Sequence, residues 1–128
     1  MKTIVAGSRK GADYNTVLQA MQDAPWDINT VISGTAKGVD TLGEQVAKNY
    51  GIPVKRYPAD WRNLDVPGVV VKHNIYGAYN AIAGHQRNTL MAENADALVA
   101  IWDGKSKGTK NMIDTAKTKN LKIYIHLI

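Results

Sequence analysis

A glycine- and lysine-rich turn follows an apolar stretch near the C-terminal end of the chain. Residues 97–102 are apolar, residues 103–109 read DGKSKGT, and residues 107–120 have the spacing of an amphipathic helix. Glycine lets backbone N–H groups approach an anion, and the start of a helix adds the positive end of its dipole. We therefore expect phosphate binding at this turn. Its candidate residues are Asp103, Gly104, Ser106, Lys107, Gly108 and Thr109.

Two earlier turns contain the same residue types. Gly7, Ser8 and Arg9 follow the expected strand at residues 2–6, and a longer turn follows residues 29–33. The candidates in this longer turn are Ser33, Gly34, Thr35, Ala36, Lys37, Gly38 and Asp40. One such turn is weak evidence, because any strand-to-helix turn needs glycine. Three turns that each combine glycine with a hydroxyl and a cation favour a shared ligand site.

Two roles are open for each acidic candidate. Asp103 either caps its turn or contacts a ribose hydroxyl. Asp40 either caps the following helix or accepts a ligand hydroxyl, and the cap is favoured. For Ser8 and Arg9, which follow the expected central strand, ligand contact is favoured.

The usual nucleotide and catalytic motifs are absent. Residues 34–41, GTAKGVDT, lack the Gly-Lys-Ser/Thr end of a P-loop, GKSKGTK has another residue order, and no GxGxxG occurs. The three histidines share no metal-ligand spacing, there is no cysteine, and no serine has a credible His–Asp pair. We expect no metal, no redox cofactor and no nucleophilic catalysis.

Short apolar runs alternate with helical patterns along the chain. Strands are expected at residues 2–6, 29–33, 53–57, 97–102 and 121–127, and helices at residues 13–24, 39–50, 81–94 and 107–120. Residues 60–80 interrupt this alternation and are interpreted as an inserted excursion with a hairpin around VVVKHNIY. Its aromatic residues Trp61, Tyr76 and Tyr79 form either a small core or a lid that stacks on a base. The pattern predicts an α/β, Rossmann-like three-layer sandwich with a mostly parallel five-stranded sheet and helices on both faces.

Length and composition limit the number of domains, the expected cellular location and the class of partner. A chain of 128 residues predicts one domain, residues 1–128, and its 45% hydrophobic and 21% charged residues are typical of a soluble globular protein. No apolar run reaches the length of a membrane span, so no membrane partner and a cytoplasmic location are expected. The net charge of +5 suits an acidic partner, and the scattered lysines fit a phosphorylated small molecule as well as nucleic acid.

Four segments together resemble a known group of proteins. GSR after the first strand, VISGTAKGVDTLGEQVA, AGHQRNTLMAENADALVAIWDGKSKGT and the C-terminal LKIYI are similar to the SLOG superfamily. This superfamily joins the DNA-processing protein DprA and the Lonely Guy phosphoribohydrolases, and the resemblance is greatest to its YAcAr branch, found in bacteria and phages. It implies a Rossmann-like fold, a nucleotide-derived ligand and a homo-oligomer.

The same resemblance assigns roles to individual residues. It implies that residues 33–40 form a phosphate or ribose loop and that residues 104–109 match the PGGxGT loop. It also implies that Arg87 and Asn88 match the family's Arg-Lys or Arg-Asn pair on the helix before the fourth strand. The hydrolase branch has an acid just after this loop, where this chain has Lys110, Asn111 and Met112.

We therefore expect binding rather than cleavage. The expected ligand is a nucleotide-derived small molecule such as an ADP-ribose or cyclic-nucleotide immune signal, which the protein senses or sequesters. One alternative is a phosphoribohydrolase that uses Arg87, Asp103 and Asp114. The other is DprA-like binding of single-stranded DNA, with bases on Trp61 or Tyr76.

Overall fold

The computed structural model describes residues 1–75 and 77–128. Its strands are β1 (Lys2–Gly7), β2 (Thr30–Ser33), β3 (Val54–Arg56), β4 (Val71–Asn74), β5 (Gly77–Asn80), β6 (Ala97–Trp102) and β7 (Lys122–Leu127). Its helices are α1 (Tyr14–Asp23), α2 (Val39–Asn49), α3 (Ala83–Glu93) and α4 (Lys107–Thr118). In the described part of the chain, no helix is long and apolar enough to cross a membrane.

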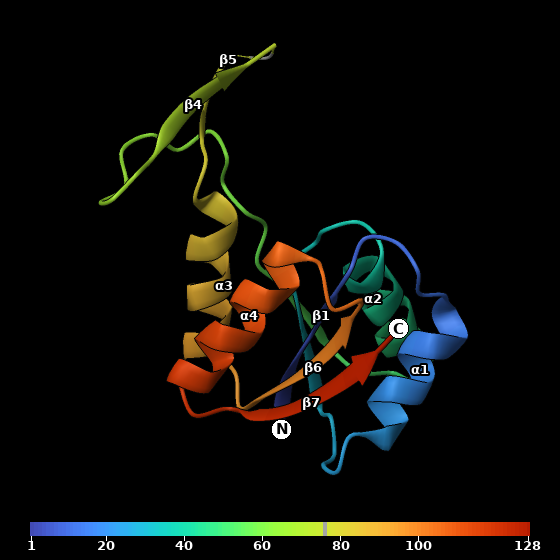
Figure 1. Ribbon diagram of the computed structural model, residues 1–128. Helices are drawn as coiled ribbons and strands as arrows, with labels where there is room; N and C mark the ends of the chain where they lie inside the picture. Colours follow the sequence, from blue (N-terminus) through green and yellow to red (C-terminus); the bar gives the residue numbers. More distant parts are fainter. Residues whose placement is uncertain (76) are drawn as a thin grey trace.

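Five strands form one parallel sheet in the order β3-β2-β1-β6-β7. Helices α1 and α2 cover one face, and α3 and α4 cover the other (Figure 1). Strand order reverses between β1 and β6, since the chain first builds outward through β2 and β3 and then returns past β1. The predicted Rossmann-like α/β class is confirmed. In open α/β sheets, the point of reversal is where ligands bind.

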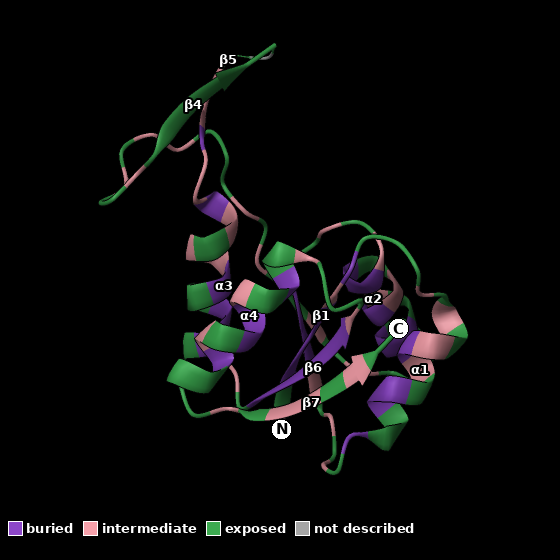
Figure 2. Ribbon diagram, in the orientation of Figure 1, coloured by how far each residue is buried: buried purple, intermediate pink, exposed green. Residues whose placement is uncertain are grey.

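The two sides of the central strands supply two cores. Val5 and Val99 face α1 and α2, whereas Ile4 and Leu98 face α3 and α4. Strand β6 is buried from Ala97 to Ile101, which explains its continuous apolar sequence (Figure 2). These covered strands make the carboxyl edge of the sheet a rigid base for the turns that follow it.

Residues 57–82 leave this body as an arm. They connect β3 to α3 and contain a separate two-stranded antiparallel sheet, β4 with β5, which projects beyond the start of α3 (Figure 1). The hairpin interpretation of the excursion is confirmed, with its strands at 71–74 and 77–80. Tyr76, one of the two residues expected to stack on a base in the DNA-binding alternative, lies outside the described residues.

Candidate functional site

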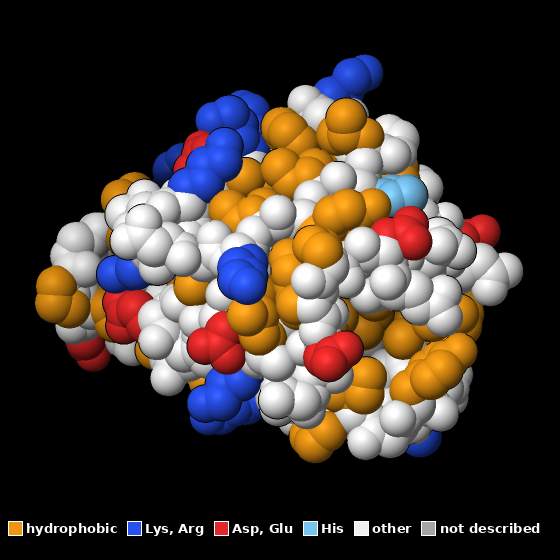
Figure 3. Space-filling model, turned by 90° about the horizontal axis from the view of Figure 1, so that it is seen from below, with side chains coloured by type: hydrophobic (Ala, Val, Ile, Leu, Met, Phe, Trp, Pro, Cys, Tyr) orange, Lys and Arg blue, Asp and Glu red, His pale blue; other side chains and the backbone are white. Residues whose placement is uncertain are grey.

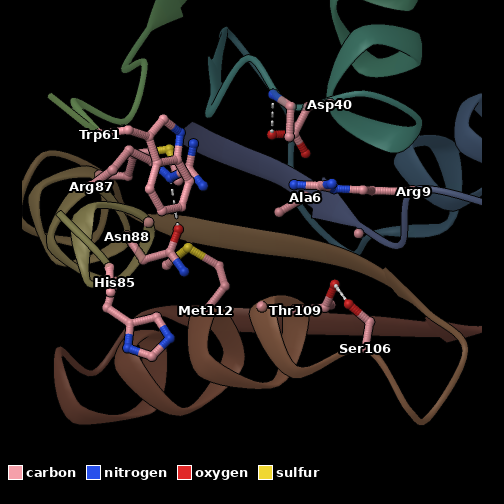
Figure 4. A pocket seen from close by; sticks show the side chains of 16 residues that line it. Ala6, Arg9, Asp40, Trp61, His85, Arg87, Asn88, Ser106, Thr109 and Met112 are labelled. Atoms are coloured by element: carbon pink, nitrogen blue, oxygen red, sulfur yellow. Dashed lines mark hydrogen bonds between the residues drawn. The ribbon is translucent and has the colours of Figure 1, made fainter. Parts of the chain in front are cut away.

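A cleft of about 430 Å³ lies at the carboxyl edge of the sheet, beside the ends of β1 and β6. Three elements close it: the turns after β1 and β2 on one side, α3 and the root of the arm on another, and the start of α4 on the third (Figure 4). The predicted site residues that line it are Gly7, Arg9, Ala36, Asp40, Trp61, Arg87, Asn88, Ser106, Gly108 and Thr109. Those that do not are Ser8, Ser33, Gly34, Thr35, Lys37, Gly38, Asp103, Gly104 and Lys107.

The turn before α4 is held in shape by Asp103. Its Oδ1 accepts the backbone N–H groups of Lys105 at 2.8 Å and Ser106 at 2.7 Å, and these bonds hold the Asp103 pKa below its ordinary value. Trp102 packs under the turn and donates its indole N–H to the Ser106 carbonyl at 3.1 Å. Asp103 therefore takes the capping role of its two predicted roles.

The start of α4 has open hydrogen-bond donors. Ser106 is the N-cap residue but makes no side-chain cap bond, and its hydroxyl lies 3.2 Å from that of Thr109. By contrast, Asp13 caps α1 by accepting the Thr16 N–H at 2.8 Å. An uncapped helix start leaves N–H groups without partners at the positive end of the dipole. At α4 these groups border the cleft at Gly108 and Thr109.

Arg9 brings a positive charge to the same cleft. It follows β1 directly, and its guanidinium points across the cleft between Asp40 and the Ser106–Thr109 pair (Figure 4). No described residue forms a hydrogen bond or ion pair with it. The prediction that Ser8 also contacts the ligand is not supported by its position. Ser8 is buried, and its hydroxyl instead accepts the Asp103 N–H at 3.2 Å.

Arg87 is used differently, because it binds the protein itself. Its Nη1 donates to the Gly34 carbonyl, and its Nε donates to Asn88 Oδ1 at 2.9 Å. Asn88 in turn donates to Asn111 Oδ1 on α4 at 2.9 Å. Arg87 thus joins α3 to the turn after β2.

Asp40 is the one acidic side chain among the described residues that line the cleft. It is buried, and its Oδ2 accepts the Ala36 N–H at 3.2 Å. Burial raises its pKa to about 6, against the opposing effects of that hydrogen bond and of Arg87. The favoured N-cap role is wrong: Gly38 is the N-cap residue, and Asp40 closes the turn from inside the first turn of α2. The helix begins at Val39, two residues earlier than a cap at Asp40 requires.

The rest of the turn after β2 is filled by internal contacts. Ser33 donates to Glu44 Oε2 at 2.6 Å, and its hydroxyl accepts the Thr35 N–H at 3.1 Å. A Cβ on Gly34 would lie 2.7 Å from Arg87 Nη1 and 2.9 Å from Asp40 Oδ2. Most of this predicted phosphate loop therefore supports the cleft from behind, and only Ala36 and Asp40 border it.

The wall formed by α3 and the root of the arm was predicted only in part. Trp61, at the root of the arm, was predicted, and its indole lies 3.4 Å from the Cβ position of Gly84. Ala81, Gly84, His85 and Met91 also line the cleft, although His85 was considered only as a metal ligand. Gly84, Arg87 and Met91 share helical spacing, which is the signal that could have identified this face of α3.

The acids of the hydrolase alternative do not meet the cleft. Asp103 holds its turn, as described above. Asp114 is exposed and forms an ion pair with Lys110 at 2.9 Å. Neither lines the cleft. In the described chain, no group of three or more acidic or histidine side chains could hold a metal ion.

Comparison with known proteins identifies the family and the fold. The structure is similar to the X-ray structure of DNA processing protein A (DprA) from Streptococcus pneumoniae, with a TM-score of 0.68 and 17% sequence identity. The match covers 97% of this chain and 49% of that one, so the chain spans about half the length of that protein, and the likeness concerns the fold alone. No curated protein matches the chain. The family model of YAcAr matches residues 1–64, which is half of the chain, and the chain therefore belongs to this YspA, cpYpsA-related SLOG family.

Proposed function

We propose that the protein binds a nucleotide-derived small molecule in the cleft between β1, α3 and α4. One observation supports this most: the Arg9 guanidinium, which has no partner among the described residues, and the uncapped start of α4 face the same cleft. A guanidinium and free backbone N–H groups together are suited to a phosphate. The cleft volume is within the range of small-molecule sites.

The remaining walls fit the other parts of a nucleotide. Asp40 lies across the cleft from α4, where its carboxylate can accept a ribose hydroxyl (Figure 4). Trp61 is 44% exposed at the mouth, which leaves its indole face open to a base. Because the acids of the hydrolase alternative lie elsewhere, the proposal is binding without cleavage. Such binding would let the protein sense or sequester a nucleotide signal.

A thermal-shift panel tests the proposal. It contains mononucleotides, ADP-ribose derivatives and cyclic dinucleotides, and a bound ligand raises the melting temperature. Arg9→Met should weaken binding about tenfold or more, since it removes a charged hydrogen bond worth about 1.5–3 kcal/mol. Lys10→Met, which removes the same charge from an exposed neighbour outside the cleft, is the matched control.

Two outcomes would contradict this proposal. The first is that no member of the panel shifts the melting temperature. The second is that a ligand binds equally well to Arg9→Met and to Lys10→Met. Chromatography of the incubated nucleotides adds a further check, because released base would show cleavage.

Single-stranded DNA is the second candidate ligand. It is favoured by the likeness to a protein whose name is DNA processing protein A. The end of the molecule opposite the cleft shows charges of both signs among hydrophobic side chains (Figure 3), so this face offers no uniformly basic path for a DNA strand. DNA binding predicts affinity that grows with oligonucleotide length and falls steeply with salt. Length-independent binding of mononucleotides would exclude it.

A further inference from the structure

The arm, residues 57–82, ends in a hairpin that lacks the support that isolated hairpins need. Its two strands bond to each other and to no other described strand. Two-stranded hairpins are marginal in water unless further strands or a packed face support them. Here Ile75 is 91% exposed, Val71 46% and Val70 44%. The arm therefore presents apolar surface beside a strand edge.

Strand β4 is the open edge of this hairpin. The Asn80 N–H donates to the Trp61 carbonyl at 2.6 Å, so the backbone of Asn80 points away from β4 and meets the root of the arm. Val71 is paired with Asn80, and its backbone therefore points outward from β4; His73 follows the same alternation. No described residue bonds to these outward groups of Val71 and His73.

Charge favours a second copy of the chain as the occupant of this edge. The arm contains two acidic residues, Asp60 and Asp65, and two basic residues, Arg62 and Lys72, so its formal charge is zero. The whole chain has a net charge of +5. Two bodies with like charge can approach with least repulsion through a neutral projection.

We propose that two copies of the chain pair through antiparallel β4 edges to form a four-stranded sheet, β5-β4-β4-β5. A register centred on His73 places Lys72 opposite Asn74 of the second copy, with Val71 at the start of β4 beside Ile75 in the turn that follows the other β4. A register centred on Lys72 would instead place the two lysines opposite each other, which is unfavourable. The pairing is isologous, as in most dimers with twofold symmetry, and gives each hairpin the additional strands that stability requires. This inference is independent of the proposed function.

Sedimentation equilibrium of the full chain tests the proposal. The wild-type protein should show a concentration-dependent dimer, and Ile75→Asp should make it monomeric. Leu127→Asp is the matched control, because Leu127 is 67% exposed on β7 at the edge of the other sheet. A wild-type monomer at all concentrations would overturn the proposal, as would a dimer that Leu127→Asp breaks and Ile75→Asp leaves intact.

Substitutions at Asn74 test the register without introducing a clash in the body. Asn74→Glu places a carboxylate opposite Lys72 twice in the dimer, and should lower the dissociation constant about two- to thirtyfold. Asn74→Lys places like charges there and should raise it. An unchanged dissociation constant in both variants would show that this register is wrong. Melting curves of both variants verify that the body remains folded.

Discussion

The turns after β2 and β6 are both rich in glycine, yet the structure uses them in different ways. In the turn after β2, Gly34 and Gly38 are surrounded by protein: a Cβ would lie 2.7 Å from Arg87 at the first and 2.5 Å from the backbone of Arg9 at the second. At the start of α4, nothing lies within 4 Å of the Cβ positions of Gly104 and Gly108. The first turn needs glycine for internal packing, and the second keeps space open beside the cleft.

This difference separates residues that hold the cleft in shape from residues that are available to a ligand. Arg87, Asp40 and Gly34 hold the turn after β2 against α3, so that their polar groups are largely paired within the protein. Arg9 and the start of α4 have polar groups without partners in the described chain. Substitutions in the turn after β2 should therefore change mainly stability, whereas those at Arg9 and at the start of α4 should change mainly binding.

The largest effect is expected at Gly38. It combines a φ of +83° with backbone atoms of Arg9 that cannot move aside, so Gly38→Ala should cost about 3 kcal/mol of unfolding free energy or more. Gly51→Ala is the matched control, because Gly51 has a φ of +68° but nothing within 4 Å of its Cβ position. It should cost about 1–2 kcal/mol. Urea denaturation measures both, and equal losses would refute the packing argument.

Asp40 should give the turn after β2 a pH-dependent stability. Its pKa is raised to about 6 in the folded state from 3.8, so the folded protein holds a proton that the unfolded chain has already released. Its contribution is therefore most favourable below pH 4 and is lost as the pH rises through 6, by at most about 3 kcal/mol.

The Asp40→Asn variant isolates this contribution. The difference in unfolding free energy between wild type and variant should change in favour of the variant from pH 4 to pH 7. A constant difference between pH 4 and pH 7 would mean that the Asp40 carboxyl ionises normally in the fold.

The sequence was sufficient for elements whose signal is local. Apolar residues 97–102 predicted β6 with its exact bounds, and the periodicity of the four helices placed each within two residues of its observed ends. The same local signals located Arg9 and Gly108 beside the cleft, because strand ends in a parallel sheet meet at one edge.

Features that depend on distant contacts could not be predicted in this way. Arg87 meets Gly34 across 53 residues of sequence, and Ser8 meets Asp103 across 95. Both pairs convert predicted ligand contacts into internal hydrogen bonds. These residue types can bind a ligand. Whether they bond to a ligand or to other groups of the protein depends on how α3 and the turns pack.

The smallest change in stability, and the sharpest test of the comparison, is expected at Gly108. It is the second residue of α4, where glycine is less favourable than alanine by about 0.5–1 kcal/mol, and a Cβ there meets no described atom. Gly108→Ala should therefore stabilise the protein by up to about 1 kcal/mol in urea denaturation. The added methyl group borders the cleft, so it should also weaken the binding of any nucleotide identified by thermal shift. Gly104→Ala, at a φ of +79° and outside the cleft, should do the reverse: lower stability and leave affinity nearly unchanged. A Gly108→Ala variant that is more stable and binds as tightly as wild type would place the ligand elsewhere, since this glycine would then serve neither packing nor binding.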